Sequence, residues 1–113
     1  MKLLISTFFT MLIIGFAGGS HGQDIETINL AGGIYIGEVK DGLPNGQGRL
    51  TFASGYVYVG EFRDGLRTGY GTATFANGNV YVGEFSDGIY NGQGTYTHAD
   101  GTARNGRWSD GFF

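Results

Sequence analysis

The chain has 113 residues, a formal net charge of −3 and no cysteine. This length allows one domain at most, and without cysteine that domain contains neither a disulfide nor a reactive thiol. Its basic residues are scattered along the sequence, whereas nucleic-acid-binding proteins carry a basic stripe. The composition therefore argues against a nucleic-acid partner and against thiol chemistry.

The N-terminal residues have the order of an export signal. Lys2 precedes an apolar run over residues 3–16, and a zone of small residues follows. Residues 1–22 are therefore predicted to be a signal peptide, cleaved near Gly19 or Gly22, which exports the protein to the periplasm or out of the cell. The alternative is an uncleaved segment that anchors the protein to a membrane, although a spanning helix needs roughly 20 apolar residues.

The rest of the chain is organised by a repeat. Residues 23–34 are predicted to be a lead-in with a capping strand over Thr27 to Ala31. From residue 35 the pattern recurs every 23 positions. A fixed period of this kind predicts an array in which each repeat is one supersecondary unit. The predicted repeat domain covers residues 35–113, with repeats at 35–57, 58–80 and 81–103 and a partial copy at 104–113.

Each repeat alternates in the way that a strand does. Tyr58, Gly60 and Phe62 fall on one face, and Val57 and Val59 fall on the other. The predicted fold class is all-β: an elongated, single-layer antiparallel β-meander of repeated hairpins. Short two-residue turns are expected at Ser54-Gly55, Asn77-Gly78 and Asp100-Gly101, and wider turns are expected to start at Asp41-Gly42, Asp64-Gly65 and Asp87-Gly88.

The aromatic face is the predicted core. Glycine in the middle of a strand marks a close approach, so rings from adjacent strands are expected to cover Gly37, Gly60 and Gly83. The predicted core aromatics are Tyr35, Phe52, Tyr58, Phe62, Phe75, Tyr81, Phe85, Tyr96 and Trp108.

The repeated carboxylates do not predict a metal site. Glu38, Glu61 and Glu84 fall on alternate strands, so about 9–10 Å separates them. Calcium needs oxygen ligands at about 2.3–2.6 Å. His98, alone after the signal segment, provides neither a zinc site nor a catalytic triad. We therefore predict no catalytic residue, no metal site and no cofactor.

The repeated motif resembles a known family. Tyr-Ile-Gly-Glu-Val at residues 35–39 and Tyr-Val-Gly-Glu-Phe at 58–62 and 81–85 are each followed by spaced glycines. This pattern is similar to the MORN repeat (membrane occupation and recognition nexus), over residues 35–111. Val39 departs from the usual Phe or Trp, and the last copy is eroded. The resemblance implies a twisted single-layer sheet without catalysis, used as a scaffold, a dimerisation element or a protein-docking surface, and often proposed to bind phospholipid.

The face opposite the aromatic core is the predicted interaction surface. A single-layer sheet leaves this face uncovered, and contiguous exposed apolar patches mark interaction sites. We expect a protein partner or self-association there or at an edge strand. The alternative is binding of phospholipid headgroups, which the acidic balance opposes. Glycan binding would require Tyr56, Tyr58 or Tyr90 to face solvent. The predicted aliphatic stripe consists of Ile34, Ile36, Val57, Val59, Val80 and Val82.

Overall fold

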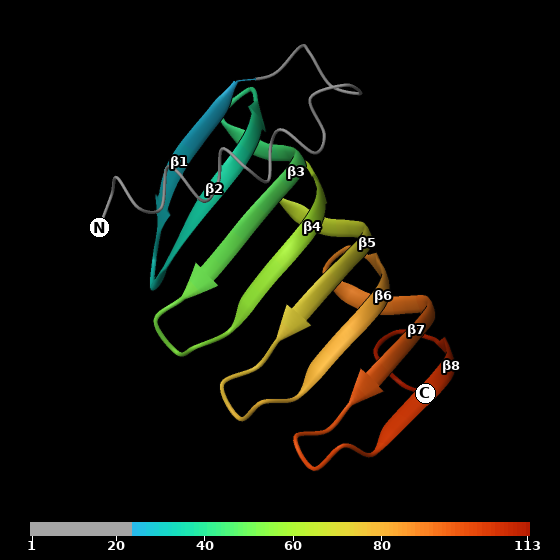
Figure 1. Cartoon of the computed structure of the whole chain (residues 1–113). Coiled ribbons are helices and arrows are strands. Elements are labelled where there is room, and N and C mark those ends of the chain that lie inside the picture. The colour runs from blue at the N-terminus through green and yellow to red at the C-terminus, as the bar shows by residue number, and fades with distance from the viewer. Residues whose placement is uncertain (1–23) are drawn as a thin grey trace.

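A computed structural model describes residues 24–113, and the predicted signal segment lies outside these residues. Eight strands form one open sheet in which sequence order and spatial order are the same (Figure 1). Every neighbouring pair is antiparallel, which confirms the predicted meander. The strands are β1 (Ile25–Leu30), β2 (Gly33–Lys40), β3 (Leu43–Phe52), β4 (Val57–Arg63), β5 (Leu66–Thr74), β6 (Val80–Ser86), β7 (Ile89–Thr97) and β8 (Ala103–Trp108).

Each repeat is one hairpin made of two kinds of strand. We call β2, β4, β6 and β8 the leading strands, because each begins a repeat, and β1, β3, β5 and β7 the return strands. The predicted capping strand corresponds to β1, which starts at Ile25 and ends before Ala31. It ends there because Leu30 pairs with Gly33, so that Ala31 and Gly32 form a two-residue turn.

The predicted turn types are wrong, because the short and the wide turns are exchanged. Lys40 pairs with Leu43, which leaves only Asp41 and Gly42 in the turn. Both have positive φ, 53° and 79°, as a type I′ hairpin turn requires. The same Asp-Gly geometry recurs at Asp64-Gly65 and Asp87-Gly88.

The opposite turns are the wider ones. The Phe52 N–H donates to the Tyr56 carbonyl at 2.9 Å, and the Gly55 N–H donates to the Phe52 carbonyl at 2.9 Å. Three residues, Ala53 to Gly55, therefore form the loop, with Gly55 in the left-handed region at a φ of 104°. A three-residue loop with a left-handed glycine is the next most common hairpin connection after the two-residue turns.

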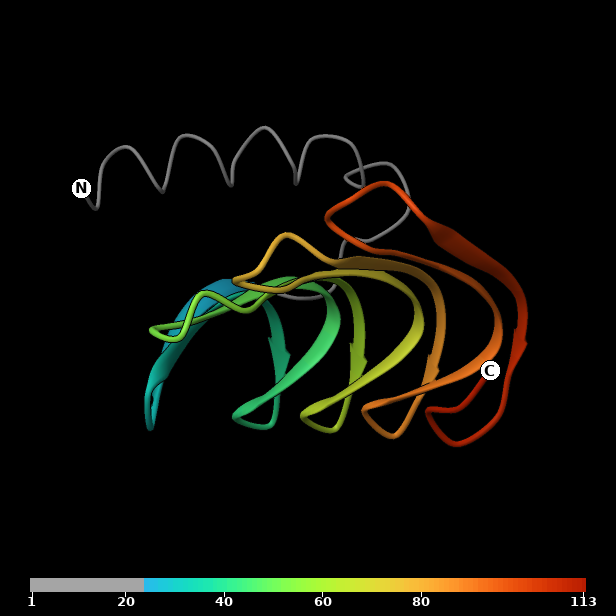
Figure 2. The same ribbon diagram turned by 90° about the horizontal axis from the view of Figure 1, so that it is seen from below.

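A row of glycines crosses the sheet where the strands bend. Every strand from β2 to β8 contributes one glycine, and each pairs with the next across the ladder. Figure 2 shows the strands curving so that the Asp-Gly tips curl round toward one face, which we call the inner face. The register also shifts just beyond this row on the leading strands β2, β4 and β6. The row consists of Gly37, Gly48, Gly60, Gly71, Gly83, Gly94 and Gly106.

Aromatic side chains fill the bend on the inner face. Tyr35, Tyr58 and Tyr81 are fully buried. Phe62 lies edge-on to both Tyr35 and Tyr58, at 4.9 and 5.1 Å between ring centres. Phe85 joins Tyr58 to Tyr81 in the same way, at 5.0 and 5.2 Å. Each phenylalanine therefore links its own repeat to the preceding one.

The predicted core aromatics divide into two groups. Those on the leading strands are buried, whereas Phe52, Phe75 and Tyr96 are half-buried and pack beside them. The sequence did not identify three aliphatic core residues, Val39, Leu50 and Ala73.

Candidate interaction surfaces

The inner-face tyrosines have a structural role. Tyr58 Oη donates to the main-chain carbonyl of Glu61 at 2.9 Å, three residues along its own strand. A ring reaches that carbonyl because the strand folds toward it. Burial, and then the charge of Glu61, raises the pKa of Tyr58. Tyr35 and Tyr81 make the same bond to the carbonyls of Glu38 and Glu84, at 2.6 and 2.9 Å.

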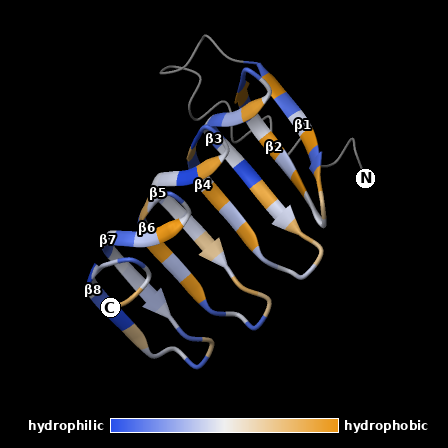
Figure 3. Cartoon of the chain, turned by 180° about the vertical axis from the view of Figure 1, so that it is seen from behind, coloured by the Kyte–Doolittle hydropathy of each residue, from blue (hydrophilic) through white to orange (hydrophobic). Residues whose placement is uncertain are grey.

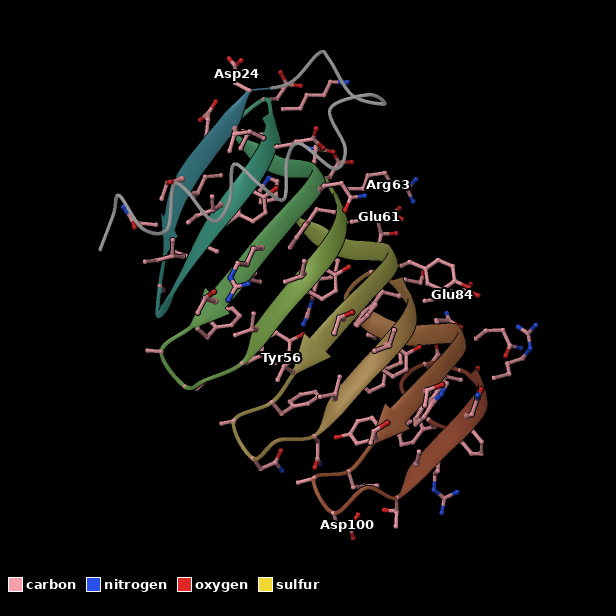
Figure 4. The ribbon with its side chains drawn as sticks, in the orientation of Figure 1. Asp24, Tyr56, Glu61, Arg63, Glu84 and Asp100 are labelled. Carbon is pink, nitrogen blue, oxygen red and sulfur yellow. The ribbon has the colours of Figure 1, made fainter. Side chains whose placement is uncertain are left out.

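The repeated glutamates close their own hairpins. Glu38 Oε1 accepts the main-chain N–H of Gln47 at 2.6 Å. Glu84 Oε2 accepts that of Gln93 at 3.1 Å. Glu61 and Glu84 lie on the same side of the sheet, one repeat apart (Figure 4). These carboxylates therefore bind the adjacent return strand, which explains their recurrence without a ligand.

A small hollow opens on the inner face, and the sequence did not predict it. Its volume is about 180 Å³, and Tyr56, Arg67, Phe75 and Tyr90 are among its lining residues. Arg67 donates to Tyr56 Oη at 2.6 Å, and its guanidinium carbon lies 5.6 Å from the centre of that ring. The sequence feature that could have indicated the hollow is Arg67, which occupies the repeat position held by Pro44 and Tyr90 in the other repeats.

The hollow bears on the glycan hypothesis. That hypothesis requires solvent-facing tyrosine rings, but Tyr58 is fully buried. Tyr56 and Tyr90 are only half-buried, and Tyr90 stacks on Tyr81 with 4.1 Å between ring centres. One of the three rings proposed for sugar stacking is therefore excluded, and the other two pack against the core.

A ridge of apolar side chains follows the curled tips, and this ridge was not predicted from the sequence. One residue directly after each Asp-Gly turn is exposed. Successive tips are joined by main-chain bonds, such as that from the Gly65 N–H to the Pro44 carbonyl at 2.9 Å. The sequence pattern that could have predicted this ridge is an apolar residue at the same position in each repeat. This tip ridge consists of Leu43, Leu66, Ile89 and Phe112.

The predicted aliphatic stripe lies on the outer face, opposite the glycine row and the core. Val59 on β4 is flanked by Arg49 on β3 and Thr72 on β5. Val82 on β6 is flanked by Thr72 and Thr95. Aliphatic residues on leading strands therefore alternate with mainly threonine on return strands, and apolar residues recur along β2, β4 and β6 (Figure 3).

The outer face is uncovered within the described part of the chain. All described strands belong to one sheet, so no second layer packs on it. Ile34 and Val82 have exposed fractions of 43% and 49%. The other four residues of the stripe, Ile36, Val57, Val59 and Val80, are half-buried. Across residues 24–113, the structure contains no helix of the length and apolarity needed to cross a membrane.

These features define a class of protein: an array of hairpin repeats that forms a single bent sheet. The family model for the MORN repeat matches residues 35–55, 58–80 and 81–103, which together make up more than half of the chain. The chain therefore belongs to the MORN repeat family. No curated protein matches the sequence.

Proposed function

We propose that this protein is an exported, non-catalytic module that works by protein–protein contact. The observation that carries the proposal is the uncovered outer face, where an aliphatic stripe runs between rows of threonine. Such a face is apolar enough to gain free energy from burial and polar enough to remain soluble without a partner. The repeated polar residues fit no catalytic role, because the inner-face tyrosines and the repeated glutamates bind main-chain groups of their own repeats.

Export rests on the sequence of residues 1–22 alone. A positive residue, an apolar run and a small-residue zone are the three parts of a secretory signal. The absence of cysteine is compatible with an oxidising compartment, because the fold relies on its ladder and aromatic core instead of disulfides. An uncleaved segment would instead anchor the same module to a membrane.

The outer-face proposal predicts the effect of two lysines. Val59→Lys with Val82→Lys places two charges in the stripe, and we expect association through this face to be lost because burying an unpaired charge is costly. The average mass in solution, measured by light scattering, should then be lower than that of the unaltered protein.

The matched control carries two lysines away from the stripe, as Ser54→Lys with Ser86→Lys, both at exposed positions. It should associate as the unaltered protein does. Circular dichroism should show that both variants retain the sheet. If the Val59→Lys, Val82→Lys variant keeps the mass of the unaltered protein, the stripe is not the contact surface.

A second candidate function is peripheral binding to phospholipid, and the tip ridge favours it. Its four exposed apolar side chains lie in a row along the hairpin tips, and such a row is typical of a surface that inserts into a membrane interface. Each tip, however, also carries an exposed aspartate: Asp41, Asp64, Asp87 or Asp110. Anionic lipid attracts clustered Lys and Arg and repels carboxylates. Protein contact is therefore our first proposal.

Co-sedimentation with vesicles separates these two functions. We expect residues 23–113 to stay in the supernatant with both neutral and anionic vesicles at every salt concentration. Pelleting with anionic vesicles that decreases as salt increases would show headgroup electrostatics and would reverse our ranking. Pelleting that is independent of salt, and that is lost in Leu66→Ser with Ile89→Ser, would identify the tip ridge as the membrane contact.

A further inference from the structure

The two edges of the described sheet are different in kind. Within residues 24–113, the strand at one edge, β1, is a return strand and the strand at the other edge, β8, is a leading strand. Within residues 24–113, the outer edge of neither strand pairs with another strand. An unpaired edge is a template for one more strand. The missing neighbour of β8 is of the same kind as β1.

The leading half of a fourth repeat is folded as in the earlier repeats. The Gly111 N–H donates to the Tyr90 carbonyl at 2.9 Å, as the Gly88 N–H donates to the Arg67 carbonyl one repeat earlier. The Arg104 guanidinium lies 5.5 Å from the Phe113 ring centre. These two residues hold the repeat positions of Tyr81 and Tyr90, whose rings are stacked. The tip of this repeat is therefore folded as in the earlier repeats. The Phe113 ring, however, lies against Gly106, where the return-strand glycine lies in those repeats, so this ring has to move aside when a strand pairs with β8.

β1 has the register of a return strand. Ile28 pairs with Tyr35, as Leu50 on β3 pairs with Tyr58 on β4. Two residues before Ile28, Glu26 pairs with Gly37, and in β3 the corresponding position holds a glycine of the row. Glu26 therefore occupies a glycine-row position at the edge of the sheet.

The residue that covers each such glycine comes from the preceding leading strand. The Tyr35 ring lies directly against Gly48, and the Tyr58 ring lies against Gly71. On β8 the residue at this tyrosine position is Arg104. The two ends of the array therefore depart from the repeat at positions that correspond: arginine replaces the covering tyrosine, and glutamate replaces the covered glycine.

The edges also carry opposite charge. The ionisable residues of β1 and its approach are Asp24 and Glu26, and those of β8 are Arg104 and Arg107, all of them exposed. Like charges directly opposite each other destabilise a pair of strands, whereas opposite charges stabilise it. Pairing of β1 with β1, or of β8 with β8, is therefore disfavoured. Pairing of β8 with β1 is favoured and brings Arg104 beside Glu26.

We propose that copies of this chain associate head to tail, with β1 of one copy completing the fourth repeat of another by pairing with β8. This inference rests on the proposed role in protein contact and specifies a second copy as the partner and the two edges as the site. Gly106 would lie opposite Glu26, in the register by which Gly83 lies opposite Gly94. The contact joins two different surfaces, so two copies joined by it still present one β1 edge and one β8 edge, and the assembly extends by addition of copies.

Charge reversal tests the proposal by mixing. In the full chain, Glu26→Arg makes both edges basic and Arg104→Glu reduces the positive charge of β8, so each variant alone should associate at least tenfold more weakly. An equimolar mixture restores both junctions, because the introduced arginine of one variant meets the introduced glutamate of the other while the remaining pair is unaltered. Sedimentation velocity over a dilution series should show mass that grows with concentration for the unaltered chain and the mixture.

The control is Arg63→Glu, which changes the net charge by the same amount as Arg104→Glu at an exposed position of the central strand β4. It should leave association unchanged. A mass that stops at twice that of one chain, single variants that associate normally, or a mixture as weak as its components would each overturn the head-to-tail contact.

The outcome is separable from that of the outer-face proposal. Val59→Lys with Val82→Lys leaves both edges intact, so head-to-tail growth should persist in that variant. Loss of association in the stripe variant, together with normal association in both edge variants, would overturn this inference and leave the protein-contact role in place. A single-chain mass under all conditions would remove self-association by either surface.

Discussion

Gly60→Ala destabilises the protein by about 3 kcal/mol, the upper end of the usual cost of overpacking. A Cβ at this position would lie 2.6 Å from the Gly71 Cα and from the Tyr70 carbonyl oxygen, and 2.8 Å from Tyr58 Oη. Two of these three atoms are main chain and cannot move without opening the ladder between β4 and β5. Because domains are stable by about 5–15 kcal/mol, urea unfolding should show a large fall in the midpoint.

Gly106→Ala is the matched control within the same row. There the added Cβ meets only the Phe113 ring, at 3.0 Å, and that side chain is exposed. Since an exposed side chain can move aside, we expect a cost below about 1 kcal/mol. Equal destabilisation by the two substitutions would mean that lost chain flexibility, and not the close approach at the bend, determines the effect.

The sequence predicts this sheet well where the pattern is local. Alternation at Tyr58, Gly60 and Phe62 assigns their common face directly, because successive side chains on a strand point to opposite faces. Repetition then identifies the family. The core residues Leu50 and Ala73 were not identified because their burial depends on the tyrosines across the ladder.

The turn types show where prediction from the local sequence pattern fails. Asp41-Gly42 is followed by another glycine, Gly46, and this spacing predicts one wide loop. In the structure Gly46 lies within β3 with a φ of 97°, and Glu38 packs against it. The register shift that this glycine accommodates is a property of two strands together. It is therefore absent from the sequence of either strand alone.

The candidate surfaces also divide into those that the sequence pattern predicts and those that depend on strand pairing. The stripe follows from alternation along single strands, so its residues were predictable. The hollow beside Arg67 and the matching of Glu26 to Arg104 require the register of the ladder. In the sequence alone, Arg104 is simply an eroded repeat position that suits a polar end cap. Only the pairing of Glu26 with Gly37 shows that both ends depart from the repeat at equivalent places.

Alkaline pH should unfold the protein steeply, because its core tyrosines are stable only when protonated. Burial is the largest cause of a raised pKa at Tyr35, Tyr58, Tyr81 and Tyr90. Unfolded tyrosine ionises near pH 10, below the pKa of these residues in the folded protein. Their contribution to stability is therefore complete below pH 10 and is lost as the pH rises toward the folded pKa values.

The steepness follows from proton linkage. Each tyrosine that stays protonated in the folded state but ionises when unfolded lowers the free energy of unfolding by about 1.4 kcal/mol per pH unit. Tyr35, Tyr58 and Tyr90, whose pKa values are raised most, together give a loss of about 4 kcal/mol per pH unit above pH 10, and Tyr81 adds to it. Urea unfolding at several pH values, with tyrosinate absorbance recorded alongside, measures this slope.

Tyr58→Phe tests the assignment, because it has opposite effects in the two pH ranges. Near neutral pH it removes the bond to the Glu61 carbonyl and should cost about 1–3 kcal/mol, since that acceptor loses its donor. Above pH 10 it removes one ionising group, so the fall in stability should be shallower by about 1.4 kcal/mol per pH unit. A slope that is unchanged in Tyr58→Phe would show that ionisation outside the tyrosine core drives alkaline unfolding.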